Sequence, residues 1–224
     1  MNFLSHFYFD RKNTNPYEVL GIVLPDLMKN ANKNWNPHPE KNENIFNSQP
    51  HQKSILKGWK RHLEVDRLFH NSDFFKYHQH QIKLVLRDIL EHSPVKPFFI
   101  GHISLELLLD SLLITDNIIS VNSFYQQLNN INKTELDKFL SLNKIDDTQQ
   151  FYKFFDNFMK ERYVYSYADE SKIAYAIRRI CMRIWENPFS LAQEEAVTKR
   201  LINYKKNLSE EFIIIFDEIE KQLN

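Results

Sequence analysis

The stretch PFFIGHISLELLLDSLLIT, residues 97–115, decides the fold class. It is apolar nearly all round, and Pro97 suits the first turn of a helix, where a missing N–H costs nothing. A helix that is apolar on every side belongs in the middle of a domain. Three polar side chains interrupt this one at intervals of four residues, namely His102, Glu106 and Asp110. We therefore expect a central helix that carries one polar stripe, in an all-α fold.

Most of the remaining chain also shows helical periodicity, and little of it alternates as a strand does. After a short N-terminal segment at 2–9, we expect helices over these ranges: 16–29, 51–71, 73–92, 120–130, 134–142, 148–161, 169–186 and 190–222. The Asn- and Pro-rich stretch 30–50 indicates a long loop. The 224 residues show no internal repeat and no clear boundary, so we expect one compact all-helical domain over 1–224.

Composition excludes several classes of protein. Lys plus Arg and Asp plus Glu both number 29, so no global charge favours nucleic acid or an anionic membrane. A single cysteine, Cys181, excludes an internal disulfide and a Cys-rich zinc site. Three glycines are too few for a Gly-rich phosphate loop. The N-terminus lacks a basic signal-peptide region and no uncharged apolar run reaches spanning length, so we expect a soluble, cytoplasmic protein.

A second polar stripe lies in GWKRHLEVDRLFH, residues 58–70, where His62, Asp66 and His70 share one helix face. An unpaired buried charge is costly, so two such stripes would need each other or a divalent metal. Asp26 in GIVLPD and His6 in NFLSHFYF also sit within apolar runs. Mixed imidazole and carboxylate donors suit Mn²⁺, Fe²⁺ or Zn²⁺, and a carboxylate-rich site tolerates Mg²⁺. Such a site can activate water and stabilise charge on a phosphoryl group.

A structural explanation of the same residues stays open. A histidine on an apolar face is often a satisfied core residue, and His62 with Asp66 can be an ordinary pair on a helix surface. His70 can stabilise a helix C-terminus through the helix dipole. In that case the stripes are buried polar networks of a non-enzymatic helical binding protein.

A basic group of side chains ends the helix expected at 169–186. Arg178, Arg179 and Arg183 could bind phosphate or an acidic partner, because guanidinium groups suit both. Lys60 would add to this patch if it lies nearby. The alternative is a solvated face with a few salt bridges.

Four segments resemble the acyl carrier protein phosphodiesterases, also called acyl carrier protein hydrolases. They are MNFLSH at 1–6, GIVLPDLMKN at 21–30, GWKRHLEVDRLFH at 58–70 and the helix that contains His102. Their order and spacing match over essentially the whole chain. The resemblance implies an all-helical fold related to the HD-type metal-dependent phosphohydrolases. It also implies hydrolysis of the phosphodiester between 4′-phosphopantetheine and the acyl carrier protein serine, with Mn²⁺ or Mg²⁺, and a link to fatty acid biosynthesis.

The resemblance carries over residue by residue. The residues that match the family's metal-site motifs are His6, Asp26, His62, Asp66 and His102. Arg178 and Arg179 resemble an arginine pair in the family's late helix. The chain departs from the family's pattern at Lys60, where a histidine is expected, and at Gly101 and His70, where aspartates are expected. These departures concern the surroundings of the site and hence the substrate.

We therefore expect an HD-like, metal-dependent phosphodiester hydrolase. His70 or Glu106 would hold the attacking water or protonate the leaving oxygen. Lys60, Arg178, Arg179 and Arg183 would bind the acidic acyl carrier protein. Another small phosphoester or a nucleotide is the alternative substrate, and neither nucleic acid nor a membrane is expected as a partner.

Overall fold

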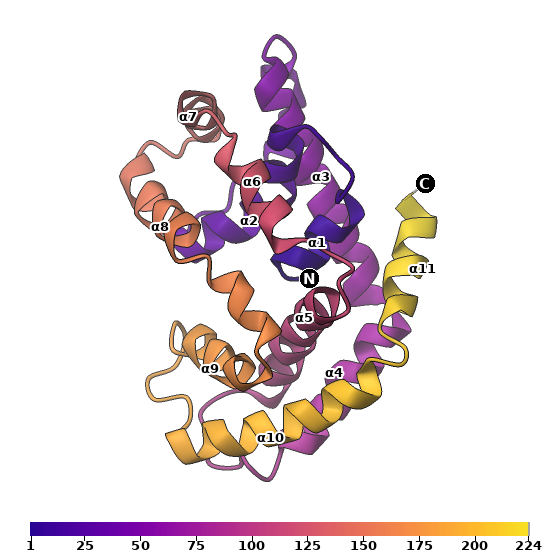
Figure 1. Ribbon diagram of the computed structural model, residues 1–224. Coiled ribbons are helices and arrows are strands. Elements are labelled where there is room, and N and C mark those ends of the chain that lie inside the picture. Colours follow the sequence, from indigo (N-terminus) through magenta and orange to yellow (C-terminus); the bar gives the residue numbers. More distant parts are fainter. Residues whose placement is uncertain (224) are drawn as a thin grey trace. The chain divides into compact units, whose positions relative to one another are not determined.

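The computed structural model describes residues 1–223, and within this range every regular element is helical (Figure 1), which confirms the all-α expectation. The α-helices are α1 (Phe3–Phe9), α2 (Pro16–Ala31), α3 (Pro50–Asn71), α4 (Asp73–Leu86), α5 (Pro97–Thr115), α6 (Val121–Asn129), α7 (Lys133–Leu142), α8 (Thr148–Glu161), α9 (Glu170–Cys181), α10 (Leu191–Leu208) and α11 (Ile213–Leu223). Short 3-10 helices cover Pro39–Lys41, Glu43–Phe46 and Tyr163–Ala168.

The structure differs from the sequence prediction mainly at helix ends. The helix expected over 190–222 is two helices, because the chain turns between Leu208 and Ile213. There the Ser209 hydroxyl donates to the Lys206 carbonyl, a local bond that competes with the helical pattern. The helices expected to reach residues 92 and 186 end at Leu86 and Cys181. Each of these two helices is followed by a segment of turns.

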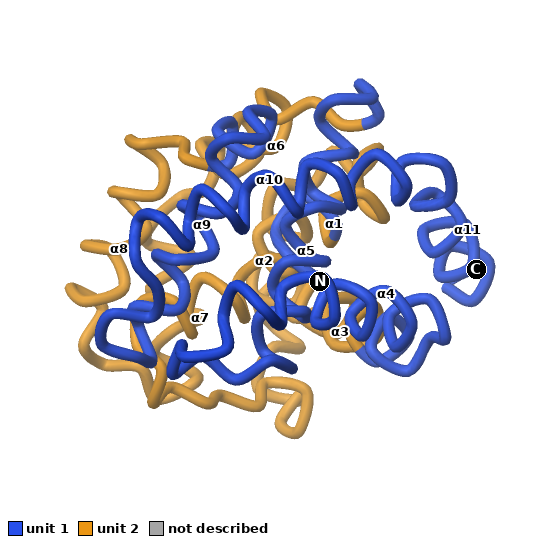
Figure 2. Tube along the Cα trace, turned by 90° about the horizontal axis from the view of Figure 1, so that it is seen from below, with its two compact units in different colours: residues 1–5, 67–118, 164–224 blue, residues 6–66, 119–163 orange. Residues whose placement is uncertain are grey.

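The chain forms two compact units (Figure 2). Unit 1 comprises residues 1–5, 67–118 and 164–224, and unit 2 comprises residues 6–66 and 119–163. The division falls inside α1 and inside α3. Each unit has its own apolar core and its own group of histidine and carboxylate side chains.

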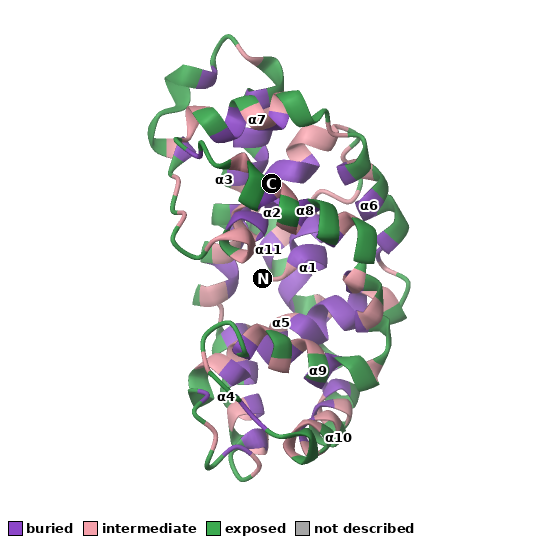
Figure 3. Ribbon diagram, turned by 90° about the vertical axis from the view of Figure 1, so that its left-hand side faces the viewer, coloured by how far each residue is buried: buried purple, intermediate pink, exposed green. Residues whose placement is uncertain are grey.

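Unit 1 is built around α5, which packs against α4, α9 and α10. Most of its residues are buried, as expected for a helix that is apolar nearly all round (Figure 3). Within the described residues, α5 alone is long and apolar enough to cross a membrane, and most of it is buried inside the protein. A core helix of a soluble protein can have the same length and composition.

Unit 2 depends on a very close contact between α2 and α3. A Cβ atom on Gly21 would lie 2.2 Å from the Ile55 carbonyl oxygen, and one on Gly58 would lie 2.1 Å from the Glu18 carbonyl oxygen. Because neither glycine has a side chain, the backbones of α2 and α3 can come into direct contact at Gly21 and Gly58. On other sides, α2 packs against α6 and α8. The contact fixes the distance between α2 and the face of α3 that carries His62.

Candidate metal centres

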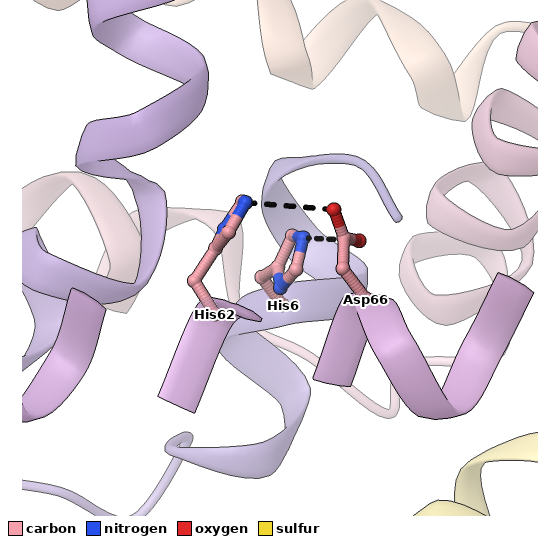
Figure 4. Close-up of side chains that lie close together, drawn as sticks. All are labelled: His6, His62 and Asp66. Carbon is pink, nitrogen blue, oxygen red and sulfur yellow. Dashed lines mark ion pairs between the residues drawn. The ribbon is translucent and has the colours of Figure 1, made fainter. Parts of the chain in front are cut away.

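A first group of polar side chains lies in unit 2 and consists of His6, His62 and Asp66. The three side chains point toward one another, His6 from α1 and the other two from successive turns of α3 (Figure 4). Nε2 of His6 lies 3.3 Å from Oδ1 of Asp66, and Nε2 of His62 lies 3.6 Å from Oδ2. The two imidazole rings are stacked with their centroids 3.9 Å apart. We call this group the unit 2 triad.

A backbone carbonyl fixes the orientation of His62. The Nδ1 atom of His62 lies 2.9 Å from the carbonyl oxygen of Ile22 on α2. A carbonyl oxygen can only accept, so Nδ1 carries the proton and donates it. In the neutral ring, Nε2 then bears a lone pair, which is aimed at Asp66. This is the usual arrangement of a metal-binding histidine, whose second nitrogen donates to a carbonyl or carboxylate.

Burial keeps the His62 ring neutral. It lowers the pKa of His62 to about 3, and the neighbouring His6 lowers it further. Burial alone would raise the pKa of Asp66, but the positive charge of the N-terminal amino group and the interactions with His6 and His62 hold that pKa below its usual range. At neutral pH, a carboxylate and the lone pair of a neutral imidazole therefore face each other at 3.6 Å. A cation that binds both groups would stabilise this arrangement.

The separations suit a metal ion. Two ligands that are each about 2.1 Å from one ion are roughly 3–3.5 Å apart at tetrahedral or octahedral angles. The ligand atoms of the unit 2 triad all lie within 4.8 Å of one another, and the two measured contacts of 3.3 and 3.6 Å fall near that range. Two imidazoles and one carboxylate form a donor set that binds Zn²⁺, Fe²⁺ and Mn²⁺.

Asp110, the last residue of the stripe on α5, has a structural role. Its carboxylate accepts hydrogen bonds from the backbone N–H groups of Leu4 and Ser5 at 3.1 and 2.8 Å, and from the Ser5 hydroxyl at 2.6 Å. These bonds satisfy N–H groups in the first turn of α1 that have no partner within the helix. They fix the start of the helix on which His6 is the next residue.

A second group lies in unit 1 and consists of His70, His102 and Glu106. Nε2 of His102 lies 2.9 Å from Oε1 of Glu106 and 3.1 Å from Nε2 of His70. Nε2 of His70 lies 3.5 Å from the same Oε1 atom. We call this group the unit 1 triad.

The predicted ligands are thus distributed over two groups, each within one unit. His6, His62 and Asp66 come together as expected, whereas His102 groups with His70 and Glu106. The acid–base role predicted for His70 and Glu106 stays a prediction.

Asp26 lies outside both groups but is placed on α2 one turn after Ile22, whose carbonyl holds His62. The i, i+4 spacing puts both on one face of α2. Asp26 therefore stays a candidate further ligand of the unit 2 triad.

The predicted substrate-binding residues have different surroundings. Lys60 precedes His62 by two residues and so points to another side of α3. Its ammonium group lies 2.8 Å from Glu43, at the edge of an open pocket of about 480 Å³ in unit 2. Arg178 donates to the Phe189 carbonyl and to Glu194 at 3.2 and 3.4 Å. Arg179 and Arg183 are exposed.

Sequence reasoning missed one contributor to these sites. The Ile22 carbonyl is a backbone group and leaves no signal in residue type. The contact between His70 and His102 joins residues 32 positions apart and agrees with the expectation that the two stripes face each other. The common spacing of four residues in both stripes was the only available signal.

No family model, no curated protein and no solved structure matches this chain.

Proposed function

We propose that this protein is a metal-dependent phosphodiester hydrolase with its metal centre at the unit 2 triad. One observation carries the metal assignment: the lone pair of neutral His62 and the carboxylate of Asp66 face each other across 3.6 Å. A divalent cation would remove that repulsion, and the stacked ring of His6 would supply a third donor. The reaction class rests on the resemblance of residues 1–6, 21–30 and 58–70 to the acyl carrier protein phosphodiesterases.

The donor set refines the choice of metal. Mg²⁺ prefers oxygen ligands and near-ideal octahedral geometry, whereas two imidazole nitrogens suit Mn²⁺, Fe²⁺ and Zn²⁺. We therefore favour Mn²⁺, Fe²⁺ or Zn²⁺ over Mg²⁺. The bound ion would supply Lewis-acid stabilisation of phosphoryl charge and lower the pKa of a water molecule.

The protein's own groups would hold the ion in a protected site. The Ile22 carbonyl orients His62, and the imidazoles of His62 and His6 are almost fully buried at 4% and 1% exposure. Asp66 is 33% exposed and forms the side of the triad that a substrate can approach. Asp26, one turn from Ile22 on α2, is the candidate for a fourth protein ligand.

The proposed substrate is holo acyl carrier protein, in the cytoplasm. Acyl carrier proteins are acidic as a class, and the exposed Arg179 and Arg183 are suitable partners for carboxylates. Arg178 already bonds Glu194 and the Phe189 carbonyl, so we assign it to holding α9 in place. Lys60 lines the open unit 2 pocket and can contact another part of the substrate.

The test combines an activity panel with isosteric variants. Wild type, Asp66→Asn and the exposed-histidine control His80→Ala are treated with chelator and reloaded with Mn²⁺, then assayed on holo acyl carrier protein and on a small phosphodiester. We expect release of 4′-phosphopantetheine by wild type and His80→Ala only. Hydrolysis of the small ester alone would retain the chemistry and change the substrate. Full activity in Asp66→Asn would overturn the proposed centre.

A further inference from the structure

The unit 1 triad contains more close contacts than its protons can satisfy. Nε2 of His70, Nε2 of His102 and Oε1 of Glu106 approach one another at 3.1, 2.9 and 3.5 Å. A neutral imidazole nitrogen either donates one proton or accepts one. If both nitrogens donate to Glu106, two N–H groups face each other at 3.1 Å. If only one nitrogen is protonated, its single hydrogen must serve two acceptors, and at least one contact is left between lone pairs.

A cation at the centre would satisfy all three contacts at once. The separations match those expected for ligands that are each about 2.1 Å from one ion, which are roughly 3–3.5 Å apart. Oε1 of Glu106 also lies 3.0 Å from the amino group of Met1. This ammonium group contacts the same Oε1 atom as the two imidazoles and compensates part of the carboxylate charge, so the ion would bind beside it.

Aromatic packing holds both imidazoles in this arrangement. The ring of Phe75 is 5% exposed and meets His70 and His102 nearly edge-on, with centroids 4.9 and 5.1 Å away. His102 and Glu106 occupy successive turns of α5, which is anchored in the core of unit 1. The three donors are therefore fixed relative to one another before any ion binds, which lowers the ordering cost of binding.

We propose that His70, His102 and Glu106 form a second divalent cation site, which takes Zn²⁺, Fe²⁺ or Mn²⁺ independently of the unit 2 triad. This inference goes beyond the proposed function, because the ion would bind whether or not the unit 2 triad is catalytic. It assigns His70 and Glu106 to ion binding in place of the acid–base role expected from the sequence. With exposures of 32%, 27% and 16%, the donors are accessible to an ion from solvent.

The experiment counts ions rather than turnover. Chelator-treated protein is titrated with Zn²⁺ alone by calorimetry, and the metal retained after gel filtration is measured by mass spectrometry. The variants are His70→Ala, Glu106→Gln, Asp66→Asn and the double variant Asp66→Asn with His70→Ala. His80→Ala, which removes an exposed histidine on α4, is the matched control. Far-UV circular dichroism checks that each variant is folded.

We expect two equivalents of Zn²⁺ in wild type and His80→Ala, one in each single triad variant and none in the double variant. If His70→Ala and Glu106→Gln retain every ion that wild type binds, the second site is overturned while the proposed function stands. If the only bound ion is lost in His70→Ala and kept in Asp66→Asn, the second site stands and the proposed catalytic centre fails. Absence of Zn²⁺ from wild type overturns both.

Discussion

The two triads have the same composition and different surroundings. Each has two imidazoles and one carboxylate, but the unit 2 histidines are 1% and 4% exposed whereas the unit 1 histidines are 32% and 27% exposed. In unit 2, burial keeps His62 uncharged, so this ring carries no positive charge that would balance the carboxylate of Asp66. In unit 1, water can reach the donors and reduce the cost of imperfect pairing. If both triads bind metal ions as proposed, burial would make the ion in unit 2 more strongly required, and exposure would make the ion in unit 1 easier to exchange.

The largest expected difference is in catalysis. Asp66→Asn should lower kcat/KM for holo acyl carrier protein by more than about 100-fold, because even outer-shell partners of a metal change affinity or activity by 10–100-fold. His70→Ala should change it by less than about 10-fold if the unit 1 ion has no catalytic role. Steady-state assays of both variants with saturating Mn²⁺ measure the contrast. Equal losses in the two variants would mean that both triads act in the reaction.

The second comparison concerns backbone contacts in the two units. Gly58→Ala places a methyl group 2.1 Å from one backbone atom of α2 and under 3.0 Å from two more. We expect it to lower the free energy of unfolding by about 3 kcal/mol or more, the upper part of the range for overpacking. Gly101→Ala in unit 1 meets one backbone atom at 2.4 Å and the next at 3.4 Å, so it should cost less, about 1–3 kcal/mol.

Urea unfolding of the metal-free proteins checks this order, with unchanged m-values as the control for two-state behaviour. A fully helical Gly58→Ala variant with wild-type stability would show that α2 and α3 are not held as closely as the structure indicates.

A third, smaller effect is the pH dependence of the metal-free protein. Because the pKa of His62 falls to about 3 on folding, the unfolded chain binds a proton between pH 6.5 and 3 that the folded chain does not. The free energy of unfolding is therefore not reduced by protonation of this residue well above pH 6.5, and it decreases as the pH falls below that value. Between pH 6.5 and 5 the loss should be roughly 2 kcal/mol, at 1.36 kcal/mol for each pH unit.

Urea unfolding at pH 7, 6 and 5 in the presence of chelator gives the slope. His62→Asn should show a shallower fall than wild type, and His80→Ala should follow wild type. A wild-type slope that is unchanged in His62→Asn would place the titrating group elsewhere.

The smallest expected effect is on the exposed arginines. Arg179→Glu with Arg183→Glu should lower kcat/KM for holo acyl carrier protein by up to about 10-fold at low salt, since charges at the rim of an interface act mainly on association. Activity on a small phosphodiester should stay unchanged, and added salt should narrow the difference. An equal loss on both substrates would point to damage of the fold.

Much of the helical architecture could be predicted from the sequence. The apolar run at 97–115 and the stripe at 62, 66 and 70 are local signals, because helix geometry decides which residues share a face. The contacts between residues on different helices could not be predicted in this way. His70 meets His102, while Asp110, on the same stripe as His102, bonds the first turn of α1. These pairings depend on packing between distant segments, and a stripe does not encode its partner.

The bond between His62 and the Ile22 carbonyl has a consequence for how substitutions act on this protein. Every amino acid supplies the same carbonyl, so the side chain at position 22 can be exchanged for another apolar group without removing the acceptor. What cannot be exchanged freely is the pair of residues without side chains, Gly21 and Gly58, that lets the two backbones touch. We therefore expect that the residues near His62 that tolerate substitution least are Gly21 and Gly58, although neither has a functional side chain.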